Sequence, residues 1–434
     1  MAKKVVIVGA GPCGVLLAHY LLGRNEQYAV DIYERRSDPR TVEISKPRTF
    51  PLVINQRGLK ALSNIKGLVE AVKAVSVKIS GSLTHQKNGK TQVLPRQKPI
   101  FCLDRTQLVI TLLDALTEKY GNNRLNIHFD HECKQVDFET KKVTFTVANT
   151  ATEVTADYDL LIGADGARSQ IREQFLSTNV FELEQKYIPS AYKSLFLPAE
   201  SATSLKSGYI HVWRADNSIS ANLVHQVDGS MNGVVTFPRE NNPVANLSTT
   251  EEVLQFFRDR FPEISQFLPE SEAEAFLNRP VSSILTIRCN RYHHGDSVLI
   301  MGDAAHATSP SLGQGCNASF EDVALFDELL NEYSDNFAEA ISQFTLRRLP
   351  DAHALVELSD YTFPLSNKLL FVEFFIRLRA AQFLHQLFPK RFSLSLFQLV
   401  SETTVPYAEI LNCHKGWISK VKQANEKFLM KTQG

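Results

Sequence analysis

Residues 4–34 read KVVIVGAGPCGVLLAHYLLGRNEQYAVDIYE, and this stretch decides the fold of the N-terminal part of the chain. A short run rich in β-branched residues, Lys4–Val8, leads into a glycine-rich turn, and helical periodicity follows from Val15 to Leu22. The next segment, Tyr28–Tyr33, alternates as a strand does and ends at Glu34. The stretch therefore predicts a βαβ unit of about 30 residues in a covered, parallel sheet.

The glycines of the turn, Gly9, Gly11 and Gly14, match the pattern G-x-G-x-x-G between a strand and a helix. The first allows a tight turn, the second lets the backbone approach a pyrophosphate, and the third permits close packing of helix on strand. The helix N-terminus favours the anion. Glu34 closes the second strand, where a carboxylate can accept hydrogen bonds from a ribose. These features predict a dinucleotide site without distinguishing FAD from NAD; the alternative is a packed turn with an incidental surface glutamate.

The whole chain has 434 residues, enough for two or three structural units of ordinary size. Its 47 lysines and arginines balance its 47 aspartates and glutamates, so neither nucleic acid nor an anionic membrane is expected as a bulk partner. The six cysteines lie far apart without a C-x-x-C pair, which predicts no metal site and fits a reducing cytoplasm. The glycines and Pro12 interrupt the apolar N-terminal run and argue against a signal peptide or a membrane span.

The pattern of elements changes along the chain. Short alternating segments from Val72 to Phe101 indicate antiparallel strands that leave the first unit, and alternation from Tyr187 to Phe237 indicates a second, mostly antiparallel sheet. The elements expected to return to the first unit are helices over 105–120 and 317–333 and strands at 126–129, 142–147, 160–162 and 297–301. The first unit is therefore discontinuous, and the C-terminal part reads as helices.

Two later segments each place a Gly/Asp pair after an apolar strand. Residues 160–172 read LLIGADGARSQIR, and residues 298–322 read VLIMGDAAHATSPSLGQGCNASFED. With the first glycine motif, in this order and spacing, the sequence resembles the flavoprotein aromatic hydroxylase family. Three further stretches are similar to the kynurenine 3-monooxygenase branch of that family: QKYIPSAYKSLFLP at 185–198, YIHVW at 209–213 and RRLPDAHALVELSDY at 347–361. The resemblance runs from the first strand to about Tyr407.

The resemblance implies an α/β fold with a Rossmann-type FAD-binding domain, an inserted antiparallel-sheet substrate domain and a C-terminal helical region. We expect the FAD-binding domain at 1–71, 102–180 and 285–336, the substrate domain at 72–101 and 181–284, and a helical cap at 337–434. The segment Leu369–Leu387 is rich in Leu and Phe but carries charges. It is either a lid over the pocket, which we favour, or an interfacial face that gives weak peripheral contact of a cytoplasmic protein with a membrane.

The resemblance also implies which residues hold non-covalent FAD. Asp303 is expected to bind the ribityl hydroxyls, where a carboxylate accepts charge-assisted hydrogen bonds. Backbone donors and a helix N-terminus are expected near the flavin N1–C2 region, where they stabilise negative charge on the reduced ring. These donors belong to Gly313, Gln314, Gly315 and Asn317. Arg36 is expected at the adenosine end, Arg105 at the phosphates or the ribityl chain, and Asp165 and Gly166 near the pyrophosphate and the visiting NAD(P)H. Taken alone, Asp165 would be a turn-former, and Arg168 or Arg172 a solvated helix charge.

One glycine motif serves two nucleotides, so NAD(P)H is expected to visit a groove rather than to occupy a Rossmann domain of its own. In the family, NAD(P)H reduces FAD, O2 adds to the reduced ring, and a flavin hydroperoxide transfers one oxygen atom to a small aromatic substrate. The chemistry belongs to the flavin, so no side chain is expected to be catalytic, His306 included. The alternatives are an FAD-dependent reductase of the geranylgeranyl-reductase type and a non-catalytic flavin-binding protein.

The expected substrate pocket contains Arg96, Phe237, Pro310 and Tyr407. The kynurenine enzymes grip the substrate carboxylate with an arginine in the strand that leaves the first domain and a tyrosine shortly after it. The matching stretch, residues 80–98, reads SGSLTHQKNGKTQVLPRQK, with Ser80 and Ser82 where the arginine is expected and Arg96 near the tyrosine position. We therefore expect an altered clamp and a larger or less anionic aromatic substrate than kynurenine.

Overall fold

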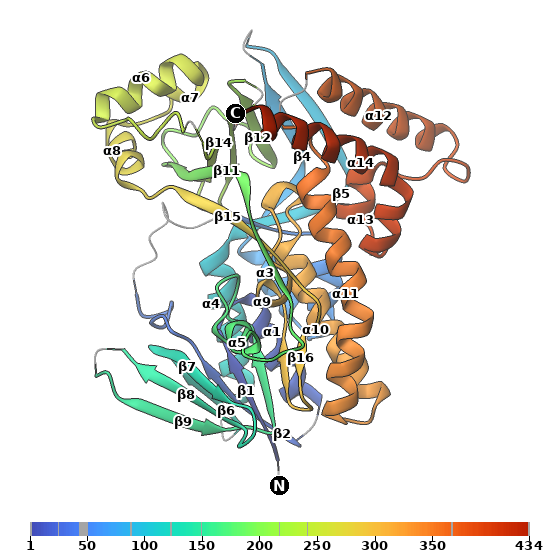
Figure 1. Ribbon diagram of the computed structural model, residues 1–434. Helices are drawn as coiled ribbons and strands as arrows, with labels where there is room; N and C mark the ends of the chain where they lie inside the picture. Colours follow the sequence, from blue (N-terminus) through green and yellow to red (C-terminus); the bar gives the residue numbers. More distant parts are fainter. Residues whose placement is uncertain are drawn as a thin grey trace.

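The computed structural model describes residues 2–24, 26–42, 51–86, 89–121, 124–148, 150–216, 218–240, 242–365 and 368–432. Lys87 and Asn88, which belong to the stretch that we compared with the kynurenine enzymes, lie outside these residues. A mostly parallel sheet lies near the N-terminus and a larger sheet lies toward the opposite end. The long helix α11 (Phe337–Tyr361) runs from the level of the first sheet toward the second (Figure 1).

The N-terminal βαβ unit forms as the sequence predicts. β1 (Lys3–Val8), α1 (Pro12–Arg24) and β2 (Tyr28–Tyr33) follow one another, and Val5 of β1 lies opposite Val30 of β2 in a parallel ladder. Their apolar side chains are buried, as expected of parallel strands covered on both faces. The sheet has the order β16-β17-β10-β1-β2-β6. Its other strands are β6 (Leu125–His128), β10 (Leu160–Gly163), β16 (His293–His294) and β17 (Val298–Ile300).

Helices α4 (Arg105–Tyr120) and α10 (Gly315–Glu332) both pack against α1. α4 begins where the sequence predicts, because the Asp104 side chain accepts hydrogen bonds from the backbone N–H groups of Thr106 and Gln107. Shorter helices join these elements: α2 (Gln56–Ser63), α3 (Leu68–Ala74), α5 (Gln170–Phe175) and α9 (Asp303–His306).

The second sheet is mostly antiparallel, as predicted, and has the order β15-β11-β14-β13-β12-β4-β5-β3; the pairing of β12 with β4 is parallel. Its strands are β3 (Pro51–Ile54), β4 (Val77–His85), β5 (Thr91–Asp104), β11 (Leu183–Leu197), β12 (Tyr209–Arg214), β13 (Ser220–His225), β14 (Met231–Pro238) and β15 (Ser282–Cys289). The domain limits that we predict remain a proposal. They have to accommodate β3 and β15, which pair into this sheet from ranges assigned wholly or partly to the FAD-binding unit.

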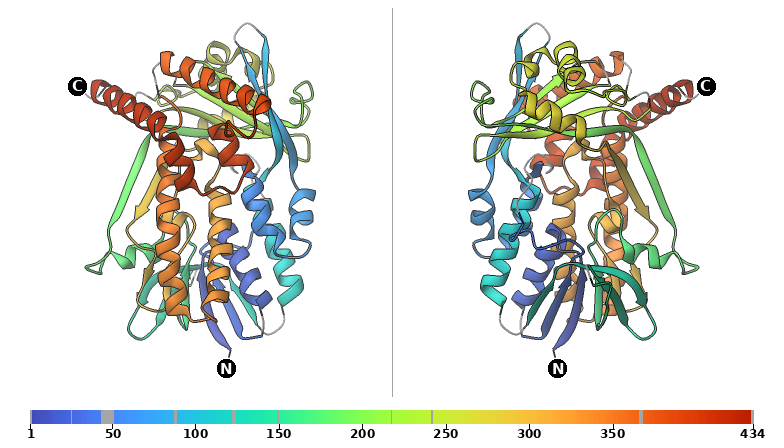
Figure 2. Two further views of the ribbon diagram at one scale, coloured as in Figure 1. Left: turned by 90° about the vertical axis from the view of Figure 1, so that its right-hand side faces the viewer. Right: turned by 90° about the vertical axis from the view of Figure 1, so that its left-hand side faces the viewer.

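Two groups of helices flank the second sheet. The helices α6 (Thr250–Arg260), α7 (Pro262–Ser265) and α8 (Glu270–Asn278) share an apolar core with β11 and β14. The C-terminal helices are α12 (Lys368–Leu387), α13 (Leu396–Glu402) and α14 (Tyr407–Thr432), and they form another core with α11. Figure 2 shows α12 and α14 at the end of the molecule opposite the N-terminus.

A small third sheet, with the order β7-β8-β9, was not predicted as a unit. Only β8 (Lys142–Val147) was expected; β7 (His131–Asp137) and β9 (Glu153–Asp157) pair with it on either side. Among the residues that the structure describes, no helix combines the length and the apolar character needed to cross a bilayer. The same residues contain no group of His, Cys, Asp and Glu side chains arranged to bind a metal ion.

Candidate functional site

The turn between β1 and α1 needs glycine at two of its three motif positions. Gly9 has a φ of +108°, and a Cβ there would lie 2.4 Å from the carbonyl oxygen of Ala164. A Cβ on Gly14 would lie 2.1 Å from the Gly9 carbonyl oxygen, so this glycine lets α1 pack closely on β1. At Gly11 a Cβ would meet none of the described atoms within 4 Å. The backbone at Gly11 therefore borders open space, where a pyrophosphate is expected.

Glu34 lies beside this turn at the end of β2. Its Oε2 accepts a hydrogen bond from the Ala10 backbone N–H at 2.9 Å, and its Oε1 accepts from the backbone N–H and Nε of Arg36 at 3.1 and 2.7 Å. Burial alone would raise the pKa of Glu34, but the Arg36 guanidinium and the two backbone donors outweigh it and hold the pKa below its usual value. The structure thus brings Glu34, Arg36 and the glycine turn together, as the sequence predicts.

Asp303 is the first residue of α9 and follows a glycine in a backbone conformation that other residues rarely adopt. Gly302 has a φ of +59°, and a Cβ there would lie 2.9 Å from Ser319 Oγ. Asp303 itself is half-buried, and among the described residues none donates a hydrogen bond to its carboxylate. Its Oδ1 lies 3.7 Å from the place where a Cβ on Gly315 would stand, so the carboxylate faces the first turn of α10. Asp303 and Gly315 are therefore neighbours, as a shared cofactor site requires.

The side chains of Gln314 and Asn317 are buried and anchor the start of α10 to the chain itself. Gln314 Oε1 accepts a hydrogen bond from Asn55 Nδ2, and Asn317 Oδ1 accepts one from the Asn55 backbone N–H, both at 2.9 Å. Asn317 Nδ2 donates to the Val53 and Gly313 carbonyl oxygens at 2.7 and 3.0 Å. The first backbone N–H groups of a helix have no acceptor within it. This arrangement leaves the backbone donors of α10, rather than these side chains, for a ligand.

Arg105 is exposed at the first position of α4. Burial raises the pKa of the Cys316 thiol to about 12, and the charge of Arg105 acts against this rise. Arg105 therefore lies within electrostatic range of the first turn of α10. Asp303 acts on the same thiol with the opposite sign, so the predicted arginine and carboxylate both lie within electrostatic range of Cys316.

The segment Asp165–Gly166 follows β10 and leads into α5. Asp165 Oδ2 accepts a hydrogen bond from the Gln170 backbone N–H at 2.7 Å, while its Oδ1 is buried without a partner among the described atoms. Burial raises the pKa of Asp165, and Gly166 has a φ of +84°. Asp165 is thus at least a turn-former, as its residue type alone suggests.

Arg172, on α5, was expected to be a solvated helix charge if taken alone, and this is wrong. Its side chain is 1% exposed and donates to the carbonyl oxygens of Ala304 at 3.0 Å and of Ala167 at 2.9 Å. These bonds join the segment after β10 to the segment after β17. Arg168, in contrast, is exposed.

The residues predicted for the substrate pocket lie in different places. Pro310 is exposed in the loop before α10, and Tyr407, fully buried, donates a hydrogen bond from its hydroxyl to Gln314 Oε1 at 3.0 Å. Arg96 Nη1 donates to Ser401 Oγ on α13 at 2.9 Å. Phe237 is completely buried in the core that β14 shares with α6–α8, so the structure gives it a packing role.

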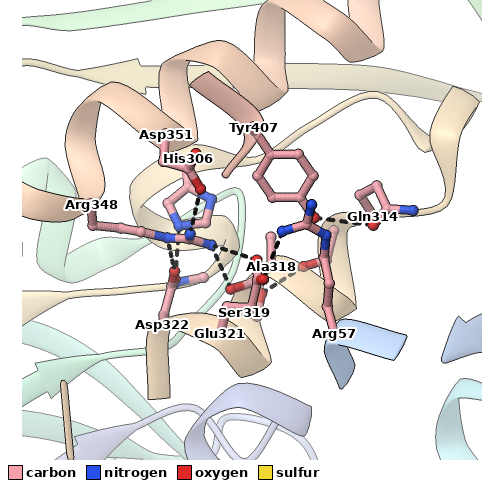
Figure 3. A network of polar contacts seen from close by, with 12 residues as sticks. Arg57, His306, Gln314, Ala318, Ser319, Glu321, Asp322, Arg348, Asp351 and Tyr407 are labelled. Atoms are coloured by element: carbon pink, nitrogen blue, oxygen red, sulfur yellow. Dashed lines mark hydrogen bonds and ion pairs between the residues drawn. The ribbon is translucent and has the colours of Figure 1, made fainter. Parts of the chain in front are cut away.

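A buried polar network that the sequence did not predict connects His306, Asp322 and Arg348 (Figure 3). Asp322 accepts hydrogen bonds from the Gly302 backbone N–H, His306 Nε2 and Arg348 Nε at 2.7, 2.7 and 2.6 Å. Glu321 joins Arg348 to Arg57, whose guanidinium stacks on the Tyr407 ring. A signal existed: Asp322 lies four residues after Ala318 and four before Phe326, on the buried stripe of α10, and a charge there needs a partner.

The three motifs meet at the carboxyl ends of neighbouring strands of the first sheet. β17, β10 and β1 are neighbours, and their parallel ladders place the Asp303, Asp165 and Gly9 segments at the same carboxyl ends. Proteins with open α/β sheets bind their ligands at the carboxyl ends of the strands. The open space at Gly11 suits the pyrophosphate of FAD. The carboxylates of Glu34 and Asp303 suit its ribose and its ribityl chain, and the backbone donors of α10 suit its ring. The residues present therefore fit this cofactor.

Comparison with known proteins agrees with this geometry. A family model described as an FAD binding domain matches residues 2–359. Over 417 residues the chain is 33% identical to kynurenine 3-monooxygenase of Drosophila willistoni, which covers 94% of this chain and 89% of the relative. The chain belongs to the FAD-dependent aromatic hydroxylases. This hydroxylase is also 30% identical to kynurenine 3-monooxygenase of Sus scrofa, with 94% and 86% of the two chains covered, and 31% identical to that of Salinispora tropica, with 94% and 90% covered.

Solved structures share the fold of this hydroxylase. The tetrameric form of 2-methyl-3-hydroxypyridine-5-carboxylic acid oxygenase matches with a TM-score of 0.68 at 18% identity, covering 83% of this chain and 90% of that one. Klebsiella pneumoniae HpxO, complexed with FAD and uric acid, matches with a TM-score of 0.65 at 15% identity, covering 99% and 95%. These structures confirm the α/β fold, while the family model and the relatives above confirm an FAD-dependent monooxygenase.

Proposed function

We propose that this hydroxylase takes electrons from NAD(P)H and inserts one atom of O2 into an aromatic or related small molecule. The observation that carries the proposal is the meeting of the Gly9, Asp165 and Asp303 segments at the carboxyl ends of three neighbouring parallel strands. The relatives named above are kynurenine 3-monooxygenases, which supports the same class of reaction for this chain.

We assign each part of non-covalently bound FAD to a group of residues. Glu34 would accept hydrogen bonds from the adenosine ribose, Gly11 would leave room for the pyrophosphate, and Asp303 would accept hydrogen bonds from the ribityl hydroxyls. The first backbone N–H groups of α10, at Gly315 and after it, would stabilise negative charge on the reduced ring. FAD supplies the electron transfer and O2 activation that amino-acid side chains lack.

The protein's own task is orientation and the exclusion of water, so we assign no side chain the role of acid or base. His306 is 2% exposed and its Nε2 is held by Asp322 at 2.7 Å, which leaves it buried behind the Asp303 segment. A general acid or base has to reach the reacting atoms directly or through one water. The position of His306 supports a structural role for this side chain.

The substrate of this hydroxylase is proposed to be a larger or less anionic aromatic than kynurenine. On β4, Ser80 and Ser82 stand where the resemblance to the kynurenine enzymes leads us to expect a carboxylate-binding arginine. Arg96 on β5 lies close to these two serines, because Gly81, between them, pairs with Pro95, which directly precedes Arg96. Its guanidinium donates a hydrogen bond to Ser401 and lies within electrostatic range of the Glu402 carboxylate.

Stimulation of NAD(P)H oxidation by candidate aromatics, measured together with oxygen uptake, tests this function. We expect at least one aromatic to raise the oxidation of NADPH or NADH by the FAD-loaded protein, with matching O2 consumption and a hydroxylated product. Substrate-dependent oxidation of NAD(P)H without O2 uptake would instead indicate a reductase that saturates its substrate. FAD binding without stimulation by any aromatic would argue against the proposal.

A further inference from the structure

Asp322 is a buried carboxylate to which the proposed reaction assigns no role. It lies on α10, is 0% exposed, and accepts hydrogen bonds from two different segments. The Gly302 backbone N–H and His306 Nε2 reach its Oδ2 at 2.7 Å each, and Arg348 Nε on α11 reaches its Oδ1 at 2.6 Å. Figure 3 shows Asp322 between His306 and Arg348.

The charge of Asp322 is what allows these bonds to coexist. Burial would raise the pKa of Asp322, but His306 and Arg348 outweigh it and hold the pKa below its usual value. An ionised carboxylate is an acceptor at both oxygens. A protonated acid or a neutral amide presents a donor at one of the two positions. That donor would face either Gly302 and His306, at the Oδ2 position, or Arg348, at the Oδ1 position. Removal of the charge therefore breaks at least one of the bonds.

The bond to Gly302 acts on the residue that follows it. Gly302 directly precedes Asp303 and adopts a φ of +59°, so its anchored peptide fixes the direction in which the Asp303 carboxylate leaves the chain. Asp322 lies on the same helix as Gly315, about two turns further on. Because a helix is rigid over this length, the Asp322–Gly302 bond sets the separation of Asp303 from the first turn of α10.

We propose that Asp322 is a positioning residue that holds Asp303 and the first turn of α10 at the separation required by the ribityl and ring half of FAD. This inference rests on the proposed roles of Asp303 and α10. The adenosine half is assigned to Glu34 and the glycine turn. Among the described residues Asp322 forms no hydrogen bond with either of them, although its charge acts on the Cys13 thiol within the turn. Loss of the Asp322 charge should therefore weaken the binding of FAD and leave the binding of ADP unchanged.

A purely structural role makes a different prediction. Arg348 also donates to the Ala318 carbonyl oxygen at 2.9 Å and to Asp351 at 2.9 Å, so the network ties α10 to α11 as well. If Asp322 served only this packing, its replacement would loosen the whole unit. The affinities for FAD and ADP would then fall together with the melting temperature.

Titrations of the full-length apoprotein with FAD and with ADP separate these roles. For Asp322→Asn we expect the Kd for FAD to rise about tenfold or more, as loss of a hydrogen bond to a charged group predicts. We expect its Kd for ADP to stay within about twofold of the parent value, because Asp322 forms no hydrogen bond with the residues assigned to the adenosine half. Asp327→Asn is the matched control, because Asp327 lies on the same helix and pairs with Arg24 at 2.7 Å. Both affinities should be unchanged in it.

A second variant keeps the inference testable if Asp322→Asn does not fold. His306→Phe removes one donor to Asp322 and keeps an aromatic ring beside Tyr292, whose ring centroid is 5.8 Å away. We expect weaker FAD binding and a changed flavin midpoint potential, with ADP binding unchanged. An unaltered Kd for FAD in the variant that folds, or a parallel loss of FAD and ADP affinity, would overturn the inference. If the parent protein binds FAD but no aromatic stimulates NAD(P)H oxidation, the proposed function fails while these binding results still decide the role of Asp322.

Discussion

The hydroxyl of Tyr407, the first residue of α14, donates a hydrogen bond to Gln314 Oε1 at 3.0 Å, directly before α10 begins. Tyr407 was predicted for the substrate pocket and Gln314 for the cofactor site, and both side chains are buried. The bond means that the C-terminal helices support the loop expected to face the flavin. Substitutions in the helical cap should therefore affect cofactor binding as well as substrate binding.

Gly11→Val should weaken FAD binding without unfolding the protein. A Cβ at Gly11 meets none of the described atoms within 4 Å, so the added side chain would occupy the space assigned to the pyrophosphate. We expect an apoprotein with nearly the parent melting temperature that retains little flavin on desalting. Gly14→Val is the contrasting control, because a Cβ there lies 2.1 Å from a backbone oxygen and should lower the melting temperature itself. Parent-like FAD affinity in Gly11→Val would contradict this placement.

Asp303→Ala should also release the flavin, for an electrostatic reason. Each hydrogen bond to a charged group contributes about 1.5–3 kcal/mol, so the loss of one should raise the Kd for FAD by roughly 10- to 150-fold. Flavin fluorescence during titration of the apoprotein measures this. Asp296→Ala serves as the control, since Asp296 is exposed and pairs with Lys141 at 3.0 Å. A parent protein that is colourless and takes up no added FAD would refute the assignment of the whole site.

The sequence predicted those parts of the fold whose side chains follow a regular period. The apolar strand and glycine turn of β1–α1 and the alternation along β11–β14 carry their own local signal. The β7–β9 sheet was missed because its outer strands are largely exposed. β9 buries one side chain, Ala156, and so shows no alternation of apolar and polar residues.

The candidate site was predictable where backbone geometry fixes the residue type, as at Gly9, Gly14 and Gly302. It was not predictable where partners lie far apart in the chain. Arg172 bonds the Ala304 carbonyl, 132 residues away, and nothing near Arg172 in sequence indicates that its charge is buried. A charge on the apolar stripe of a helix is the local sign of such a partner, although it does not identify the partner.

His19 should make the protein less stable as the pH falls below about 6.5, the usual pKa of an exposed histidine. It is 1% exposed on α1, and burial lowers its pKa to about 4 although Nε2 bonds the Leu112 carbonyl oxygen. Between these values the unfolded chain binds a proton that the folded chain does not, so the free energy of unfolding decreases with falling pH. The contribution of His19 at pH 5 is about 2 kcal/mol.

Urea unfolding at pH 7 and pH 5 measures the effect of His19. His19→Gln keeps a donor for Leu112 but does not titrate, so its loss of stability between the two pH values should be about 2 kcal/mol smaller than that of the parent. Replacement of the half-buried His385 on α12 by Gln should leave the loss unchanged. Equal losses for the parent and His19→Gln would show that this histidine does not contribute.

Helix α12, which we favour as a lid over the pocket, should bind liposomes weakly at most. Leu370, Phe374 and Leu378 face the core of the cap, while Leu369 and Ile376, 80% and 62% exposed, belong to a second apolar face in solvent. An exposed apolar face of this kind suits the membrane interface. We expect little flotation, and Ile376→Ser and Phe383→Ser should reduce any that occurs. Absence of flotation would leave α12 as a lid alone, and firm salt-resistant binding would show an anchor stronger than we predict.

L-Kynurenine should be a poor substrate of this hydroxylase. The relatives of this chain are named for kynurenine, yet β4 carries Ser80 and Ser82 where the resemblance expects the arginine that binds the substrate carboxylate. Hydrogen bonds to a charged group contribute about 1.5–3 kcal/mol each, so loss of the clamp should weaken binding by roughly 10- to 150-fold.

Within the matching stretch, Arg96 is our candidate for a residue that restores the clamp. It would first have to leave Ser401, to which Nη1 donates at 2.9 Å, and the neighbouring Glu402 carboxylate. Steady-state assays with L-kynurenine, comparing the parent with Arg96→Ala and with Arg258→Ala on the distant helix α6, decide the matter. We expect a high KM for kynurenine in all three proteins. Coupled 3-hydroxylation at micromolar kynurenine that is lost only in Arg96→Ala would show that Arg96 has rebuilt the clamp and that the predicted substrate class is wrong.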